Sequence, residues 1–138
     1  MGSATVKWIG GLDFVGIGSN NHSVVLSGAK EAVGVSPSEM LLVALAACSS
    51  VDVVEILAKK RMPLSFMEVL VSSENDPDPP WTFRKIRVTY RLAGKDLTEK
   101  AVSQAIALSQ EKYCSVTATV RGTAEIVTDF EILSAGGS

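Results

Sequence analysis

The segment from Ser36 to Arg61 constrains the fold most, because it predicts one long helix with almost no polar face. Ser36 suits the N-cap, Pro37 suits the first helical position, and Glu39 completes a capping box. From Met40 to Val51 the helix is apolar on every side, which is typical of a helix in the centre of a structure. A chain of 138 residues has little material to surround such a helix, so burial between two subunits is a natural arrangement.

The rest of the chain predicts an α+β fold of antiparallel strands and two main helices. Alternating polarity from Ile86 to Leu92 is typical of a half-buried strand, and Gly and Pro clusters mark the turns. The first strands are expected at Ala4–Ile9, Leu12–Ile17 and His22–Ser27, and the second helix at Thr98–Gln110. We expect a single domain over 1–138, with an N-terminal β-meander (1–35), the central helix (36–61), strands (64–93), helices (97–121) and a C-terminal strand (123–133).

Composition and charge exclude several classes of function. The net charge of -2 and a pI near 5.4, with no basic cluster, argue against binding to nucleic acid. The longest apolar run, Met40 to Cys48, is shorter than the roughly 20 residues that span a bilayer, so no membrane segment is expected. Two cysteines without a signal-peptide pattern favour a reducing, cytoplasmic compartment. One histidine and no CxxC motif argue against a zinc site, and neither metal nor cofactor is expected.

Cys48 lies in the apolar helix, and its role has two interpretations. At about 100° per residue, Asp52 and Glu55 share its face, whereas Glu39 points to the opposite side. A neighbouring negative charge raises the pKa of a thiol, so this placement discourages a thiolate. A buried cysteine in such a helix is more often inert packing than a nucleophile, and the residues alone leave both interpretations open.

Cys114 is the second cysteine and has a more polar setting. Lys112 is close in sequence, and Ser115 is a suitable cap for a following short helix, which would bring backbone N–H groups near the sulfur. Such surroundings favour a thiolate. A half-buried thiol after a helix, with no chemical role, fits the same residues equally well.

Four further residues are weaker candidates for the site. Asp52 is either a buried acid that ties a dimer together or a proton-transfer partner. His22 begins a predicted strand, where a lone histidine is more often a surface or cap residue than a catalytic one. Tyr113 and Trp81 either line an apolar pocket or serve packing alone.

The contexts of the two cysteines carry a resemblance to a known family. The segment SPSEMLLVALAACSSVDVVEIL, followed after two strands and a helix by LSQEKYCSV, resembles the OsmC/Ohr family of organic hydroperoxide reductases, and within it the YhfA-like subgroup. The likeness covers essentially the whole chain, with KWIGGLDFVGIGSNNHSVVLSG as the N-terminal meander and FRKIRVTYRLAG as the central strand. Two cysteines in these contexts, in this order, form a specific signature.

The resemblance implies an OsmC-like fold, in which an intertwined homodimer packs the cysteine-bearing helices in its middle and forms two sites at the subunit interface. In the family mechanism the first cysteine, here Cys48, attacks the O–O bond of a peroxide and becomes a sulfenic acid. The second, here Cys114, condenses with it to a disulfide, which a dithiol such as a lipoylated protein reduces. Apolar surroundings favour organic hydroperoxides over hydrogen peroxide.

The chain departs from the family pattern in the groups that lower the pKa of the first thiol. Peroxidatic members use an arginine from the N-terminal region, and this sequence has none before Arg61. They place a glutamate ten residues before the first cysteine, where this chain has Ser38, and the neighbouring Glu39 has the capping role instead. The substitute cations to consider are Lys7, Lys30, or an arginine from the central strand of the partner subunit, which is Arg84, Arg87 or Arg91 in this sequence.

The sequence therefore predicts a thiol-dependent peroxidase that reduces organic hydroperoxides in oxidative-stress defence. One alternative is an OsmC-like redox or small-molecule-binding dimer without efficient peroxidase activity, because the family arginine and glutamate are absent. A third possibility is a structural dimer whose cysteines serve packing alone.

Overall fold

The computed structural model describes residues 2–29 and 33–134 of the chain. The chain forms two compact units, Met1–Leu41 and Leu42–Ser138. The predicted α+β class is confirmed, since two three-stranded sheets occur together with helices. The expectation of a single domain over the whole chain stays a prediction.

The first unit contains the predicted meander. Strands β1 (Ala4–Gly10), β2 (Asp13–Gly18) and β3 (Ser23–Ser27) pair antiparallel in the order β1-β2-β3. The turn between the first two strands uses Gly10 and Gly11, whose φ angles of 113° and 54° lie in the left-handed region that favours glycine. The two adjacent glycines thus explain why the hairpin turns where the sequence predicts it.

Helix α1 (Pro37–Lys59) begins at the predicted capping box. The backbone N–H of Glu39 donates to the hydroxyl oxygen of Ser36 at 3.2 Å, and this hydroxyl donates to the Glu39 carboxylate at 3.1 Å. These contacts satisfy a backbone donor that has no partner inside the helix. Glu39 therefore serves the start of the helix, as the sequence indicates.

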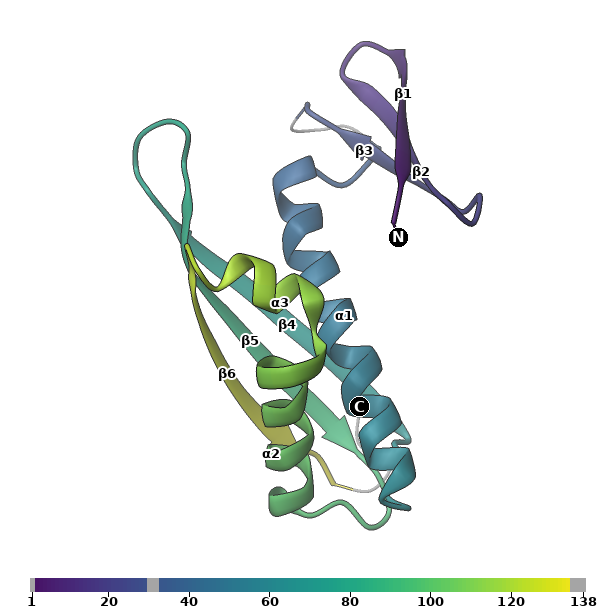
Figure 1. Ribbon diagram of the computed structural model, residues 1–138, viewed down its shortest axis with the longest axis vertical. Coiled ribbons are helices and arrows are strands. Elements are labelled where there is room, and N and C mark those ends of the chain that lie inside the picture. Colours follow the sequence, from purple (N-terminus) through teal and green to yellow (C-terminus); the bar gives the residue numbers. More distant parts are fainter. Residues whose placement is uncertain (1, 30–32, 135–138) are drawn as a thin grey trace. The chain divides into compact units, whose positions relative to one another are not determined.

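The second unit joins the rest of α1 to a three-stranded sheet with the order β4-β5-β6 (Figure 1). Its elements are β4 (Phe66–Asn75), β5 (Phe83–Ala93), α2 (Glu99–Leu108), a π-helical turn η1 (Ser109–Tyr113), α3 (Ser115–Val120) and β6 (Glu125–Ile132). The β4–β5 pair is antiparallel, as predicted, whereas β6 pairs with β5 in parallel. The expected antiparallel pairing of this last strand is wrong, because the helices before it form a crossover that returns the chain to the same end of the sheet.

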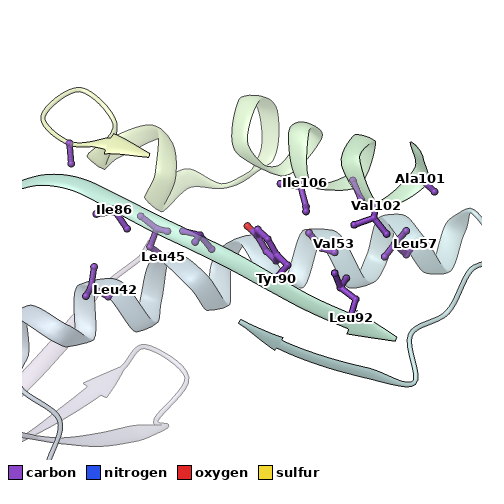
Figure 2. Close-up of a cluster of buried hydrophobic side chains, with 13 residues drawn as sticks. Leu42, Leu45, Val53, Leu57, Ile86, Tyr90, Leu92, Ala101, Val102 and Ile106 are labelled. Atoms are coloured by element: carbon purple, nitrogen blue, oxygen red, sulfur yellow. The ribbon is translucent and has the colours of Figure 1, made fainter. Parts of the chain in front are cut away.

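The core of the second unit lies between its sheet and the helices α1 and α2 (Figure 2). The predicted alternation on β5 is confirmed, since every second side chain from Ile86 to Leu92 is fully buried. Apolar side chains of both helices pack against them; they are Leu45, Val53 and Leu57 of α1, and Val102 and Ile106 of α2. This packing fixes the helix that carries Cys48 against the segment that leads to Cys114.

Helix α1 covers the core with one side and exposes apolar residues on another. Val43, Val51 and Val54 are 48%, 57% and 44% exposed in the single chain, so the expected burial of α1 between two subunits stays a prediction. A single sheet covers only one side of a helix, so the remaining apolar side has no cover within the described part of the second unit. By length and composition α1 is also long enough to cross a bilayer, a test that the core helix of a soluble domain passes as well.

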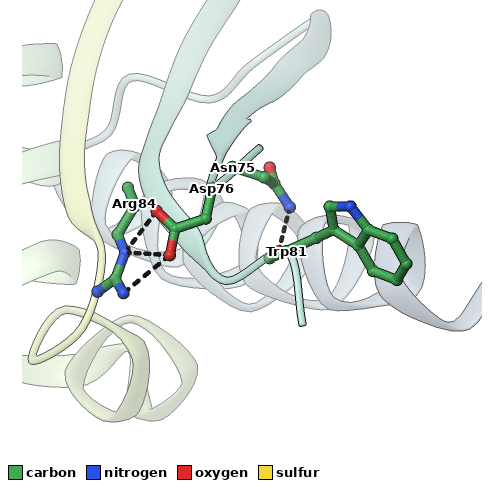
Figure 3. Close-up of polar contacts among 4 residues, drawn as sticks. All are labelled: Asn75, Asp76, Trp81 and Arg84. Carbon is green, nitrogen blue, oxygen red and sulfur yellow. Dashed lines mark hydrogen bonds and ion pairs between the residues drawn. The ribbon is translucent and has the colours of Figure 1, made fainter. Parts of the chain in front are cut away.

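The loop between β4 and β5 is held by polar contacts of its own (Figure 3). The guanidinium of Arg84 donates to both carboxylate oxygens of Asp76 at 3.0 to 3.1 Å, and the amide of Asn75 donates to the carbonyl of Trp81 at 2.9 Å. The Trp81 side chain is 58% exposed. Trp81 therefore does not pack in the core of the second unit, and its role in lining a pocket stays a prediction.

Candidate functional site

The two cysteines lie in the second unit, in different surroundings. Cys48 is half-buried in the middle of α1, and Cys114 is 3% exposed. Cys114 is the single extended residue between the π-helical turn and α3, with φ -78° and ψ 104°. Both thiols are free, and each lies close enough to the other to shift its pKa. Folding therefore brings together two thiols that are far apart in the sequence.

Hydrogen bonds from the start of α3 stabilise the thiolate of Cys48. Burial by itself would raise the pKa of this thiol, but the backbone N–H of Val116, the Cys114 thiol, and the side chain and backbone of Ser115 donate hydrogen bonds that together lower the pKa. The expectation that Asp52 and Glu55 discourage a thiolate is wrong in direction. Helical geometry places carboxylates on the Cys48 face but does not reveal the donors that a distant segment supplies.

The pKa of Cys114 is shifted in the opposite direction, upward. Burial raises the pKa of this thiol, hydrogen bonds from the hydroxyl and backbone N–H of Thr117 oppose the rise, and the neighbouring Cys48 raises it further. The expected cap at Ser115 is wrong, because Cys114 itself is the N-cap of α3 and accepts from the Thr117 N–H at 3.4 Å. The ammonium of Lys112 lies 5.6 Å from the centroid of the Tyr113 ring. The favoured thiolate is therefore on Cys48, and Cys114 holds its proton.

A buried polar network joins the neighbourhoods of the two cysteines. Ser49, the residue after Cys48, shares a hydrogen bond with the Tyr90 hydroxyl. The hydroxyl oxygen of Ser109 lies 3.0 Å from that of Ser49, and the Gln110 amide donates to both the Ser49 and Tyr90 hydroxyls at 3.2 Å each. Sequence analysis missed this network. Its one visible signal is a serine within an otherwise apolar helix, which needs a partner once buried.

Asp52 and Tyr113 line a common pocket beside α1. Asp52 is half-buried and accepts a hydrogen bond from the Ser109 hydroxyl at 2.8 Å. The pocket has a volume of about 410 Å³, and its lining residues are Asp52, Glu55, Ile56, Lys59, Lys60, Leu108 and Tyr113. Asp52 thus has a hydrogen-bond partner within its own chain, both interpretations of its role stay predictions, and Tyr113 lines a pocket rather than a core.

Comparison with known proteins identifies the family. The sequence model described as OsmC-like protein matches residues 28–129, which include both cysteines. The chain belongs to the OsmC-like family. Protein YhfA of Escherichia coli K12 is 37% identical over 132 residues, which are 96% of this chain and 98% of YhfA. Membership of the OsmC-like family suggests a redox or peroxide-related function.

Two solved structures support the OsmC-like fold. An OsmC-like protein from Mycoplasma pneumoniae has a TM-score of 0.84 at 16% identity, with 97% of this chain and 98% of that chain covered. The organic hydroperoxide resistance protein OhrB of Bacillus subtilis has a TM-score of 0.62 at 18% identity, with 94% and 98% covered. At these identities the likeness shows the fold alone.

The remaining candidates of the OsmC-like chain belong to the first unit. Ser38 and Glu39 are exposed in the first turn of α1, and Glu39 is engaged by Ser36. His22 is exposed, and its backbone N–H donates to the Asn20 side chain at 3.3 Å in the turn before β3. Local contacts therefore account for Glu39 and His22, and any catalytic role for the three residues stays a prediction.

The cations considered as substitutes for the family arginine have different positions. Arg84 is paired with Asp76, and Arg91 with Glu68 at 2.8 Å. Arg87 is exposed on β5, Lys7 lies on β1, and Lys30 lies outside the described residues. Hydrogen bonds alone, without a cation, lower the pKa of the Cys48 thiol. Within the described part of this chain, donors from α3 lower the pKa of the Cys48 thiol, and a substitute cation from a partner subunit stays a prediction.

Proposed function

We propose that this OsmC-like protein is a thiol-dependent peroxidase that reduces organic hydroperoxides, with Cys48 as the attacking and Cys114 as the resolving cysteine. The observation that carries the proposal is that two neighbouring thiols have pKa values shifted in opposite directions. The pKa of Cys48 is lowered by donors from α3, whereas burial raises the pKa of Cys114. A nucleophilic thiolate beside a protonated thiol is the arrangement that the two successive steps need.

The chemistry proceeds in two steps. The Cys48 thiolate attacks an oxygen of the hydroperoxide, the O–O bond breaks, and the released alkoxide takes up a proton to become an alcohol, leaving a Cys48 sulfenic acid. The sulfur of Cys114 then attacks the sulfenic sulfur, the S–O bond breaks, and water leaves with the Cys114 proton. A dithiol, for which a lipoylated protein is the candidate, restores both thiols by exchange.

The proposal includes a homodimer with its sites at the subunit interface, in the cytoplasm. The exposed apolar side of α1, which carries Val43, Val51 and Val54, supports a second subunit as its cover. Cys48 lies on the same helix, so a partner there would exclude water from the half-buried thiol. An apolar enclosure of that kind favours organic hydroperoxides as substrates.

A second candidate is a dimeric redox protein without efficient peroxidase activity. It is favoured by the absence of a cation among the groups that lower the pKa of the Cys48 thiol. Hydrogen bonds stabilise the thiolate but place no positive charge beside the departing alkoxide. The cysteine pair would then serve reversible disulfide exchange.

Peroxide consumption by the purified protein distinguishes these candidates. The substrates are cumene hydroperoxide, tert-butyl hydroperoxide and hydrogen peroxide, and dihydrolipoamide is the reductant. We expect faster turnover of the organic substrates, loss of turnover in Cys48→Ser, and accumulation of the sulfenic acid in Cys114→Ser. A wild-type protein that forms the disulfide with diamide but consumes no peroxide would favour the second candidate. Undiminished turnover in Cys48→Ser would remove this residue from the mechanism.

A further inference from the structure

Ser109 is the residue that connects the turn before Cys114 with the helix that carries Cys48. Its side chain is fully buried, and it is the first residue of the π-helical turn. The backbone carbonyl of Ser109 accepts a hydrogen bond from the N–H of Cys114 at 2.8 Å, the bond that closes this wide turn. Ser109 thus fixes the backbone position from which the Cys114 side chain projects.

The hydroxyl of Ser109 also contacts two residues of α1, Ser49 and Asp52, which lie about one helical turn apart. Its oxygen lies 2.8 Å from a carboxylate oxygen of Asp52, 3.0 Å from the Ser49 hydroxyl and 3.3 Å from the Ser49 carbonyl. Ser49 follows Cys48 directly, and Asp52 is one turn further along the helix. Ser109 therefore contacts Ser49, the neighbour of Cys48, through its side chain, and it contacts Cys114 through its backbone carbonyl.

The carboxylate determines the direction of the hydrogen bonds in this network. A carboxylate accepts and does not donate, and a serine hydroxyl has one hydrogen. Ser109 therefore donates to Asp52, which leaves its oxygen free to accept from Ser49. The Ser49 oxygen in turn accepts from Tyr90 and from the Gln110 amide. In this arrangement every hydroxyl hydrogen has one acceptor, and the Asp52 carboxylate stabilises the network at one end.

We propose that Ser109 is a positioning residue for the disulfide step. Its contacts hold the turn that leads to Cys114 close enough to Cys48 for the two sulfurs to bond. This inference rests on the proposed function, in which the Cys114 sulfur replaces the hydroxyl of the Cys48 sulfenic acid and water leaves. A disulfide tolerates only a narrow range of geometry, with Cβ atoms about 3.5 to 4.5 Å apart. Loss of the Ser109 hydroxyl removes the contacts of this side chain with Ser49 and Asp52, leaves the turn bonded to α1 through the side chain of Gln110, and makes that approach rarer.

The test compares Ser109→Ala with Ser103→Ala, which removes a hydroxyl from the exposed side of α2. The first measurement is the equilibrium between the Cys48–Cys114 disulfide and reduced dithiothreitol, which requires no peroxide. We expect disulfide stability to fall about tenfold in Ser109→Ala and to stay within about twofold of wild type in Ser103→Ala. Equal stability in all three proteins would overturn the inference.

The second measurement separates the two chemical steps. One equivalent of cumene hydroperoxide is added, and dimedone traps the Cys48 sulfenic acid that has not yet formed the disulfide with Cys114. Ser109→Ala should oxidise Cys48 at the wild-type rate but yield more dimedone adduct, whereas a merely structural role would change both rates together. Asp52→Ala removes the charged acceptor from the half-buried end of the network. It should show the same defect to a smaller extent, and it serves as the test if Ser109→Ala fails to fold.

The two claims fail in distinguishable ways. A wild-type protein that forms the disulfide but consumes no peroxide overturns the proposed function and leaves the role of Ser109 in disulfide stability standing. A wild-type protein with full turnover, together with unchanged closure in Ser109→Ala and Asp52→Ala, overturns the role of Ser109 alone.

Discussion

The hydroxyl of Thr117 donates a hydrogen bond to the sulfur of Cys114 at 3.1 Å, and the backbone N–H of the same residue donates a second at 3.4 Å. Both residues are buried, with Thr117 only 1% exposed. Burial raises the pKa of Cys114, and these two donors oppose the rise. They leave a thiol that favours its protonated form, with two donors that stabilise the negative charge on the sulfur once the proton departs.

Thr117→Val tests this relationship with a side chain of similar shape. The hydroxyl donor is lost while the backbone N–H remains, so we expect a further rise in the pKa of Cys114 and disulfide closure about tenfold slower at neutral pH. The pKa is measured as the pH dependence of iodoacetamide alkylation of Cys114 in a Cys48→Ala background, and disulfide closure is measured in the protein that retains both cysteines. Thr119→Val is the matched control, because the exposed Thr119 hydroxyl donates to the Ser115 carbonyl instead. An equal shift in both variants would contradict the prediction.

The reactivity of Cys48 should extend to lower pH than that of an ordinary thiol. Its pKa is lowered, so the thiolate is present above this lowered pKa and is lost as the pH falls through it. We expect half-maximal alkylation of Cys48 below pH of about 8.5, the value of a free cysteine. Cys114→Ala should move the midpoint upward, because one of the donors to the thiolate is removed. A midpoint at or above that of free cysteine would show that the α3 donors do not offset burial.

Tyr90→Phe should destabilise the second unit by about 1 to 3 kcal/mol, because the buried Ser49 and Gln110 groups lose a hydrogen-bond partner. The measurement is the urea midpoint, with Tyr113→Phe as the exposed control. The same control protein retains Tyr90 as its single tyrosine, so absorbance at high pH reports Tyr90 alone.

The pKa of Tyr90 is shifted upward from that of a free tyrosine. Burial raises its pKa, hydrogen bonds with Ser49 and Gln110 oppose the rise, and the charges of Cys114 and Asp52 add to it. The stability that comes from keeping the phenol neutral is complete below the unfolded pKa of about 10 and is lost as the pH rises through the folded value. Titration of Tyr90 at or below that of free tyrosine would contradict its burial.

Val51→Glu tests whether a second subunit covers the exposed side of α1. Val51 is 57% exposed in the single chain, so a charge costs little there unless a partner buries it. We expect dimers of the wild-type protein and monomers of Val51→Glu at micromolar concentration in analytical ultracentrifugation. Ser103→Glu adds the same charge to the exposed side of α2 and should leave the dimer intact. Dimers of equal stability in both variants would place the interface elsewhere.

Local patterns in the sequence were sufficient for most elements of the fold. Ser36 and Glu39 predict the start of α1, and the alternation from Ile86 to Leu92 predicts both β5 and its buried face. These features depend on residues within one or two turns of each other, so the sequence contains all the information that they need. The parallel pairing of β6 was not predictable in this way, because it depends on the path of the whole crossover.

The sequence by itself determined that two cysteines lie in two distinct contexts, one in an apolar helix and one after a helix, and these contexts identify the family. Tertiary structure alone decided which thiol has its pKa lowered and which has it raised. The pKa of Cys48 depends on N–H groups of Val116 and Ser115, and the setting of Cys114 depends on contacts of Ser109 with α1. Hydrogen bonds act over about 3 Å in space, whatever the separation along the chain, so helical periodicity at Cys48 gave the wrong sign.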